Sequence, residues 1–150
     1  MILLVHLLFG AAIGTIVNNI PLAIILAFLG HYFLDIFPHI EYPIRNADKK
    51  QWQHISCDTI KIAIDFLLGI TIVFTFSNNQ IIIYICALVA ILPDGLTIIN
   101  HILPNKILSI HENFHSENVH FLKDKKISYF WRIISQVLFI IVSVFLLKFK

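Results

Sequence analysis

Most side chains that could do chemistry in this chain are histidines and aspartates that interrupt strongly apolar stretches. His31 and Asp35 lie four residues apart, which places them on one face of a helix. His111 and His115 repeat this spacing. Ionisable groups within apolar helices are costly to bury and are therefore candidate functional residues. The full set of candidates is His6, His31, Asp35, Asp65, Asp94, His111 and His115.

A mixed set of imidazoles and carboxylates predicts a site for a divalent transition metal. Calcium and magnesium prefer oxygen ligands alone, whereas imidazole is a ligand of zinc and iron. We therefore expect zinc, with manganese or iron as alternatives, and ligands enough for two ions. Such an ion would activate water for hydrolysis. A carboxylate that is not a ligand, Asp65 or Asp94, would accept the proton from that water.

Each candidate also has a structural interpretation. His6 alone would more often pack between helices, and Asp35 could form an ion pair with Arg45. Asp94 follows Pro93 and could bind backbone groups freed by a helix break. The other histidines are assigned to loops, with the first of them the best placed to join the site: His39, His54, His101 and His120.

The elements that carry these residues are too apolar for a soluble or a disordered protein. Of the 150 residues, 58% are hydrophobic and 13% are charged, and the mean hydropathy is +0.84. Soluble domains carry about 25% charged residues. We expect one all-helical transmembrane domain over residues 1–150, with five apolar runs long enough to cross a bilayer. The expected spans are residues 1–17, 20–37, 58–76, 80–99 and 127–149.

A further helix is expected over residues 105–122, outside the apolar runs. Large apolar residues form a stripe at helical spacing along it: Ile107, Ile110, Phe114 and Phe121. An amphipathic helix of this kind lies in the membrane interface. There it could cover the mouth of the candidate site.

The positions of lysine and arginine predict the orientation in the membrane. The two long segments, after the second and fourth spans, contain Arg45, Lys49, Lys50, Lys106, Lys123, Lys125 and Lys126, whereas the opposite side has Lys148 and Lys150. By the positive-inside rule, the long segments and the N-terminus are cytoplasmic in a multi-pass protein of the inner (plasma) membrane. This orientation brings five candidates to a similar depth near the cytoplasmic face: His6, His31, Asp35, Asp65 and Asp94.

Several short motifs resemble those of the predicted membrane-bound metal-dependent hydrolases of bacteria. The resemblance rests on residues 5–10 (VHLLFG), residues 30–35 (GHYFLD), residues 92–94 (LPD) and the pair His111 and His115. The His-x3-Asp spacing is also similar to one used by the helical zinc phospholipases C and related nucleases. The resemblance implies a small polytopic membrane protein that hydrolyses a phosphoester or lipid-like substrate with a bound metal. The Gly-His-x3-Asp element stands second here rather than last.

Two other function classes fit the buried polar groups. One is an ion- or proton-coupled transporter, in which these groups relay protons or bind a cation. The other is a non-catalytic membrane scaffold, in which they hold helices together by hydrogen bonds. The net charge of +2 suits contact with anionic lipid and does not indicate nucleic acid. The lipid bilayer and a lipid or phosphoester substrate are therefore the expected partners.

Overall fold

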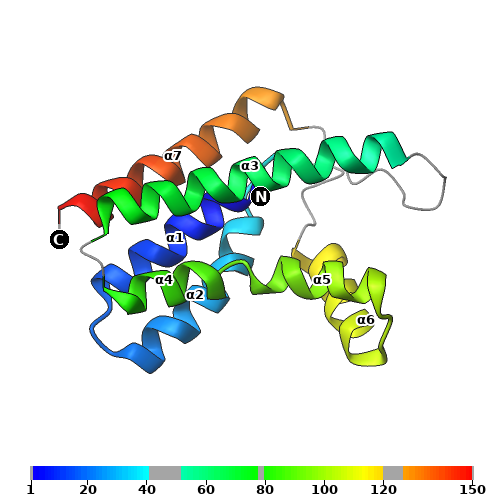
Figure 1. Cartoon of the computed structure of the whole chain (residues 1–150), viewed down its shortest axis with the longest axis horizontal. Coiled ribbons are helices and arrows are strands. Elements are labelled where there is room, and N and C mark those ends of the chain that lie inside the picture. Colours follow the sequence, from blue (N-terminus) through cyan, green and yellow to red (C-terminus); the bar gives the residue numbers. More distant parts are fainter. Residues whose placement is uncertain (1, 41–51, 78–79, 120–126, 150) are drawn as a thin grey trace.

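The protein is a bundle of helices (Figure 1). The computed structural model describes residues 2–40, 52–77, 80–119 and 127–149, and this part of the chain contains helices and no strands, which confirms the all-helical prediction. The helices are α1 Leu3–Ile16, α2 Ile20–Asp35, α3 Trp52–Phe76, α4 Ile81–Val89, α5 Leu92–Ile102, α6 Lys106–Asn113, the π-helix η1 Phe114–Val119, and α7 Tyr129–Lys148.

The first helix, α1, is the centre of the bundle. It contacts α2, α3, α4 and α7, and ten of its 14 residues are buried. Gly10 and Gly14 allow α4 to approach closely. A Cβ atom on Gly10 would lie 2.4 Å from the carbonyl oxygen of Cys86, and one on Gly14 would lie 3.0 Å from the Cα of Ile83. The helix is therefore apolar because other helices surround it.

Two helices are long and apolar enough to cross a membrane alone: α7 and residues Thr59–Phe76 of α3. The pair α4 and α5 would be a third span, bent by 42° at a short break. α1 and α2 have 14 and 16 residues, or about 21 and 24 Å at 1.5 Å per residue. A bilayer core is about 30 Å thick. The prediction of five spans is therefore wrong, and the described helices supply two or three.

The count of five fails because an apolar run can be longer than the helix within it, or can contain more than one helix. The runs at 1–17 and 20–37 include connecting residues at their ends, so the helices within them are shorter than the runs. The run at 80–99 is interrupted at residues 90–91, where the chain makes a turn. The run at 58–76 belongs to a longer helix that begins at Trp52, whereas the run at 127–149 matches α7 closely.

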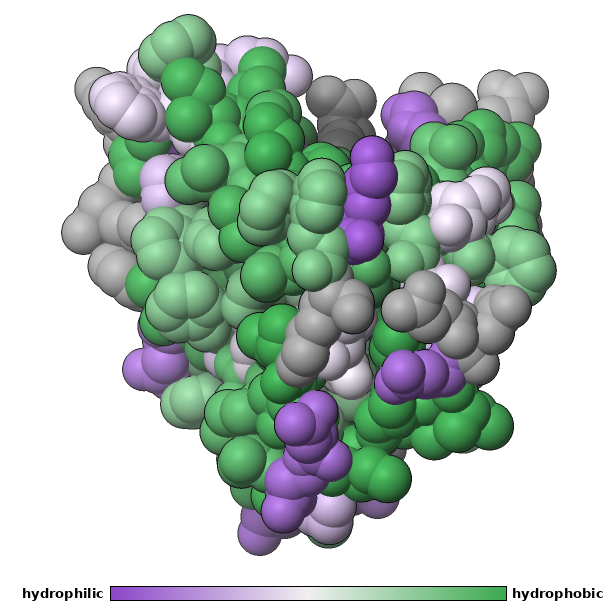
Figure 2. Space-filling view, turned by 90° about the vertical axis from the view of Figure 1, so that its left-hand side faces the viewer, coloured by the Kyte–Doolittle hydropathy of each residue, from purple (hydrophilic) through white to green (hydrophobic). Residues whose placement is uncertain are grey.

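The outer surface is strongly apolar. Large hydrophobic side chains of α3 and α7 are exposed, among them Leu67, Phe74 and Phe145 at 62%, 64% and 58%. Figure 2 shows hydrophobic residues over most of one face, with hydrophilic residues in isolated places. A surface of this kind is compatible with insertion into a membrane.

The ends of the bundle differ. The start of α1, the end of α2 and the start of α7 lie at one end, and α5 and α6 project beyond it (Figure 1). The short connection between α1 and α2 lies at the opposite end, as does the end of α7. A helix is present where one was expected over residues 105–122, as α6 followed by η1, and residues 120–122 fall outside the described part. Its apolar stripe is exposed, with Ile107 at 75% and Ile110 at 61%.

Candidate metal centre

The centre begins with His31 and Asp35 in the last two turns of α2. Their spacing of four residues brings the Nε2 atom of His31 to 3.1 Å from Oδ2 of Asp35. Both side chains are fully buried. The sequence prediction that these two residues face each other is therefore confirmed.

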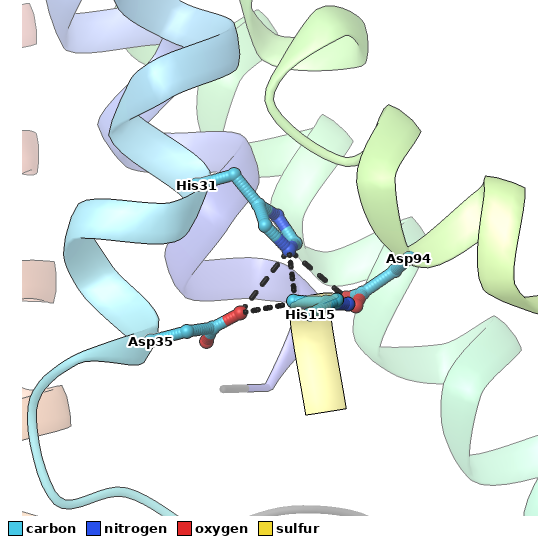
Figure 3. Close-up of side chains that lie close together, drawn as sticks. All are labelled: His31, Asp35, Asp94 and His115. Carbon is cyan, nitrogen blue, oxygen red and sulfur yellow. Dashed lines mark hydrogen bonds and ion pairs between the residues drawn. The ribbon is translucent and has the colours of Figure 1, made fainter. Parts of the chain in front are cut away.

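Two further side chains reach this pair from distant parts of the chain (Figure 3). Asp94, in the first turn of α5, places Oδ1 at 3.5 Å from Nε2 of His31. His115, in η1, places Nε2 at 3.2 Å from both Nε2 of His31 and Oδ2 of Asp35. One ligand atom from each of the four residues lies within 4.8 Å of all the others, so the group could hold a metal ion.

The break between α4 and α5 fixes the orientation of His31. Nδ1 of His31 lies 2.8 Å from the carbonyl oxygen of Ala90, which is in this break. A carbonyl oxygen only accepts, so the ring proton is on Nδ1 and the lone pair of the neutral ring is on Nε2. Metal-binding histidines commonly donate a hydrogen bond from the N–H of their second ring nitrogen to a carbonyl in this way.

A hydrogen-bonded connection positions His115. The side chain of Asn100 in α5 donates to Glu112 of α6 and accepts from Ser109 and from the backbone amide of Asn105. The α-helix then continues as the π-helix η1, in which His115 is the second residue. Single π-helical turns occur often at functional sites. The connection holds α6 against α5 and so brings His115 to the end of α2.

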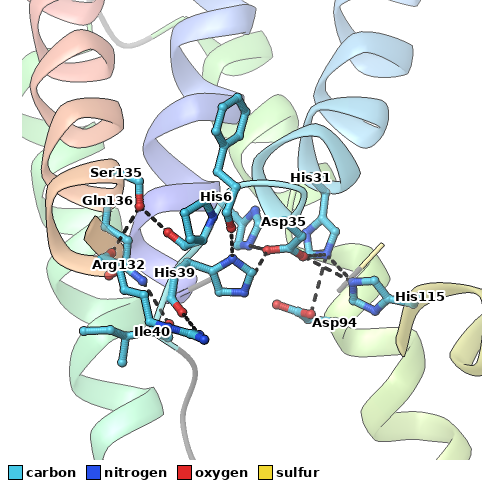
Figure 4. Close-up of polar contacts among 12 residues, drawn as sticks. His6, His31, Asp35, His39, Ile40, Asp94, His115, Arg132, Ser135 and Gln136 are labelled. Atoms are coloured by element: carbon cyan, nitrogen blue, oxygen red, sulfur yellow. Dashed lines mark hydrogen bonds and ion pairs between the residues drawn. The ribbon is translucent and has the colours of Figure 1, made fainter. Parts of the chain in front are cut away.

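Two more histidines approach Asp35 from its other side (Figure 4). His6, in the first turn of α1, places Nε2 at 3.2 Å from Oδ1 of Asp35, and its ring stacks on that of His31 with centroids 4.1 Å apart. His39, just after α2, places Nε2 at 3.8 Å from the same oxygen. His6 was a predicted site residue, whereas His39 was assigned to a loop.

The backbone around His39 is held by α7. Arg132 donates to the carbonyl of His39 at 3.0 Å, and Gln136 donates to the carbonyl of Ile40 at 2.9 Å. Ser135 donates to the carbonyl of Pro38. These bonds position an irregular segment that has no helical hydrogen bonds of its own. His39 follows Asp35 by four residues, but it lies beyond the end of α2, so helical spacing does not explain how it reaches Asp35.

The remaining predicted site residues lie outside the group of four. Asp65 of α3 accepts a hydrogen bond at 2.9 Å from the backbone amide of Leu4, in the first turn of α1. His111 of α6 lies 2.9 Å from the hydroxyl of Tyr32 through Nε2. Burial and the nearby His115 lower the pKa of His111. Asp65 therefore caps α1, and His111 joins α6 to α2.

The arrangement requires positive charge. Asp35 is buried, and the lone pair on Nε2 of His31 faces its carboxylate and Nε2 of His115. Acceptor atoms this close repel one another unless a proton or a metal ion lies among them. Donor atoms bound tetrahedrally at about 2.0–2.1 Å lie about 3.3 Å apart. The separations of 3.1 and 3.2 Å around Asp35 suit a bound ion.

Comparisons of the chain with models of known protein families, with curated proteins and with solved structures found no match.

Proposed function

We propose that the protein is a metal-dependent hydrolase of the inner membrane that acts on a phosphoester or lipid-like substrate at the cytoplasmic interface. The observation that carries the proposal is the convergence of His31, Asp35, Asp94 and His115 on one point at one end of the bundle. Two imidazoles and a carboxylate are typical ligands of zinc in hydrolases. Zinc is therefore the proposed metal, with manganese or iron as alternatives.

The four residues divide into two roles. Catalytic zinc sites have three protein ligands and keep a position open. His31, Asp35 and His115 are buried to 94% or more of their side chains and would be the ligands, whereas the side chain of Asp94 is 31% exposed. A bound divalent ion lowers the pKa of a water ligand toward about 7 and polarises the group under attack. Asp94 would accept the proton of that water.

The position of the centre suits a substrate at the membrane surface. It lies at the end of the bundle from which α5 and α6 project, and α6 presents the exposed residues Ile107 and Ile110. An amphipathic helix with such a face binds at the boundary of headgroups and acyl chains. A lipid headgroup would then be within reach of Asp94, the exposed member of the group.

The first test is metal content and activity of the detergent-purified protein. We expect stoichiometric zinc or manganese in the wild type, loss of this metal in His31→Ala and Asp35→Ala, and hydrolysis of a simple phosphodiester or of phosphatidylglycerol vesicles by the loaded protein. Metal-free wild-type protein would contradict the proposal. Cation flux through liposomes without hydrolysis would favour a transporter instead.

A further inference from the structure

The carboxylate of Asp35 faces imidazole nitrogens on both of its oxygens. Oδ2 has Nε2 of His31 at 3.1 Å and Nε2 of His115 at 3.2 Å. Oδ1 has Nε2 of His6 at 3.2 Å and Nε2 of His39 at 3.8 Å. Each oxygen therefore has its own pair of histidines, and Asp35 lies between the two pairs (Figure 4).

The rings on the Oδ1 side are oriented as those of ligands. Nδ1 of His39 lies 2.6 Å from the carbonyl oxygen of Phe37, so it carries the proton and the lone pair of the neutral ring is on Nε2. His6 is completely buried, and within the described part of the chain neither of its ring nitrogens makes a hydrogen bond. The contact of its Nε2 with Asp35 is thus close without the direction of a hydrogen bond.

The ring of His6 stacks on the ring of His31, and this stacking sets the distance between the two pairs of histidines. The rings of His6 and His31 are nearly parallel, at 22°, with centroids 4.1 Å apart. Their Nε2 atoms reach different oxygens of the same carboxylate. In two-metal hydrolytic sites the ions lie about 3.5–4 Å apart. The separation of the stacked rings is therefore compatible with two ions bridged by the carboxylate of Asp35.

We propose that the centre holds two divalent ions, with Asp35 as the bridging ligand. One ion is held by His31, His115 and Oδ2, and the other by His6, His39 and Oδ1. The second position rests on the proposed function, because it shares a ligand with the first. Two divalent ions also compensate the two carboxylates of the buried centre, Asp35 and Asp94, and leave positive charge to attract an anion.

A two-ion centre favours a phosphoester as the substrate. A pair of ions stabilises both the attacking and the leaving oxygen in a displacement at phosphorus. Positive charge in excess of the carboxylates favours an anionic phosphodiester over a neutral carboxylic ester. The bonds from Arg132 and Gln136 to residues 39 and 40 serve this centre by fixing His39, the one proposed ligand outside a helix.

The decisive measurement is the number of metal equivalents in zinc-loaded protein purified in detergent micelles, measured by mass spectrometry. Two equivalents agree with the proposal. One equivalent would overturn the second position and leave the proposed function standing. No bound metal would overturn both.

Variants assign the two positions. His39→Ala and His6→Gln are each expected to lose one equivalent and keep the other, and Asp35→Ala is expected to lose both. His111→Ala is the matched control, because this histidine binds Tyr32 and lies outside both ligand sets. Retention of two equivalents in both His39→Ala and His6→Gln would overturn the assignment.

A spectroscopic measurement distinguishes the loss of one ion from the failure of a variant to fold. With Mn²⁺ as the probe, two ions bridged by a carboxylate show exchange coupling in the electron paramagnetic resonance spectrum of the wild type. His39→Ala, which lies outside the helices, should show an uncoupled single ion with unchanged helical circular dichroism. Uncoupled Mn²⁺ in the fully loaded wild type would contradict a bridging Asp35.

Discussion

At the scale of single residues, the direction in which a polar side chain points decides whether it belongs to the centre. His31 and His39 each donate a hydrogen bond from Nδ1 to a backbone carbonyl, and their Nε2 atoms face Asp35. Asp65 has the same chemistry as Asp35 and is buried as well, yet it faces a backbone amide. Residue type and depth in the bundle are therefore insufficient to identify a ligand.

Replacement of Asp94 by Asn should separate metal binding from chemistry. The amide cannot accept a proton, so we expect hydrolysis to fall by about 10²- to 10⁴-fold. The metal content should be retained, because the buried ligands are unchanged. Activity assays and metal analysis of the same sample test this, and loss of the metal would instead make Asp94 a ligand.

Replacement of Asp65 should affect stability alone. Asp65→Ala leaves the amide of Leu4 without its partner, and we expect a loss of about 1–3 kcal/mol in the free energy of unfolding. Asp65→Asn keeps an acceptor oxygen and should lose less. Unfolding in detergent measures the first effect and metal analysis checks that the ion remains. Loss of metal in Asp65→Asn would place this residue in the site after all.

The residues of the centre could be predicted from the sequence only in part. The pair His31 and Asp35 follows from helical spacing. His6 and Asp94 follow from polarity within apolar runs, and His115 follows from its spacing of four residues from His111. His39 could not be assigned by helix rules, because α7 holds its segment through side chains. Asp65 accepts a hydrogen bond from a backbone amide, a partner that no sequence pattern shows.

At the scale of elements, the break between α4 and α5 builds part of the centre. It sets Asp94 at the start of a helix and turns the carbonyl of Ala90 to His31. Proline in the first turn of a helix is favourable, since its missing amide hydrogen has no helical partner there. The sequence raised a helix break beside Pro93 only as an alternative interpretation of Asp94, whereas a continuous span was expected over residues 80–99, and it did not show that the carbonyl of Ala90 binds a histidine.

Removal of this proline should weaken the metal site. Pro93→Ala allows a continuous helix, in which the carbonyl of Ala90 would accept from the amide of residue 94. His31 would lose its partner, and we expect metal affinity to fall by about 10- to 100-fold. Pro21→Ala is the matched control, because Pro21 lies in the first turn of α2 away from the centre. Metal titration distinguishes them, and equal affinities would contradict this role of the break.

The fold as a set of helices was predictable, and the number of membrane spans was not. Apolar runs located α1, α2 and α7 to within a few residues, whereas α3 is longer than its run and one run is divided into α4 and α5. The error lies in α1 and α2. A helix of 14 residues among four others has the composition of a membrane span without its length.

At the scale of the whole molecule, close packing around α1 keeps the centre together. α1 carries His6, and its contact with α4 depends on Gly10 and Gly14. α4 in turn leads to the break and Asp94. A displacement of α1 from α4 would therefore separate ligands that belong to different helices.

Alanine at Gly10 tests this packing. Its Cβ would lie 2.4 Å from a backbone oxygen of α4, so we expect a loss of about 1–3 kcal/mol in the free energy of unfolding. Gly95→Ala is the control, since its Cβ would meet nothing within 4 Å, and this helical glycine should give a gain of about 0.5–1 kcal/mol. Unfolding in detergent measures both, and equal effects would contradict the close contact.

The hydrogen bonds by which α7 holds the backbone around His39 have a consequence for the order in which the chain folds. Arg132 follows His39 by 93 residues, so the ribosome synthesises the side chain that holds His39 long after it has synthesised α1 and α2. Until α7 is synthesised, α1, which carries His6, lacks a helix that later packs against it. A nascent chain that ends before α7 therefore contains His31, Asp35, Asp94 and His115 but lacks the side chains that hold the backbone of His39. Under the two-ion proposal, occupancy of the position formed by His6 and His39 would then report that α7 has packed in place.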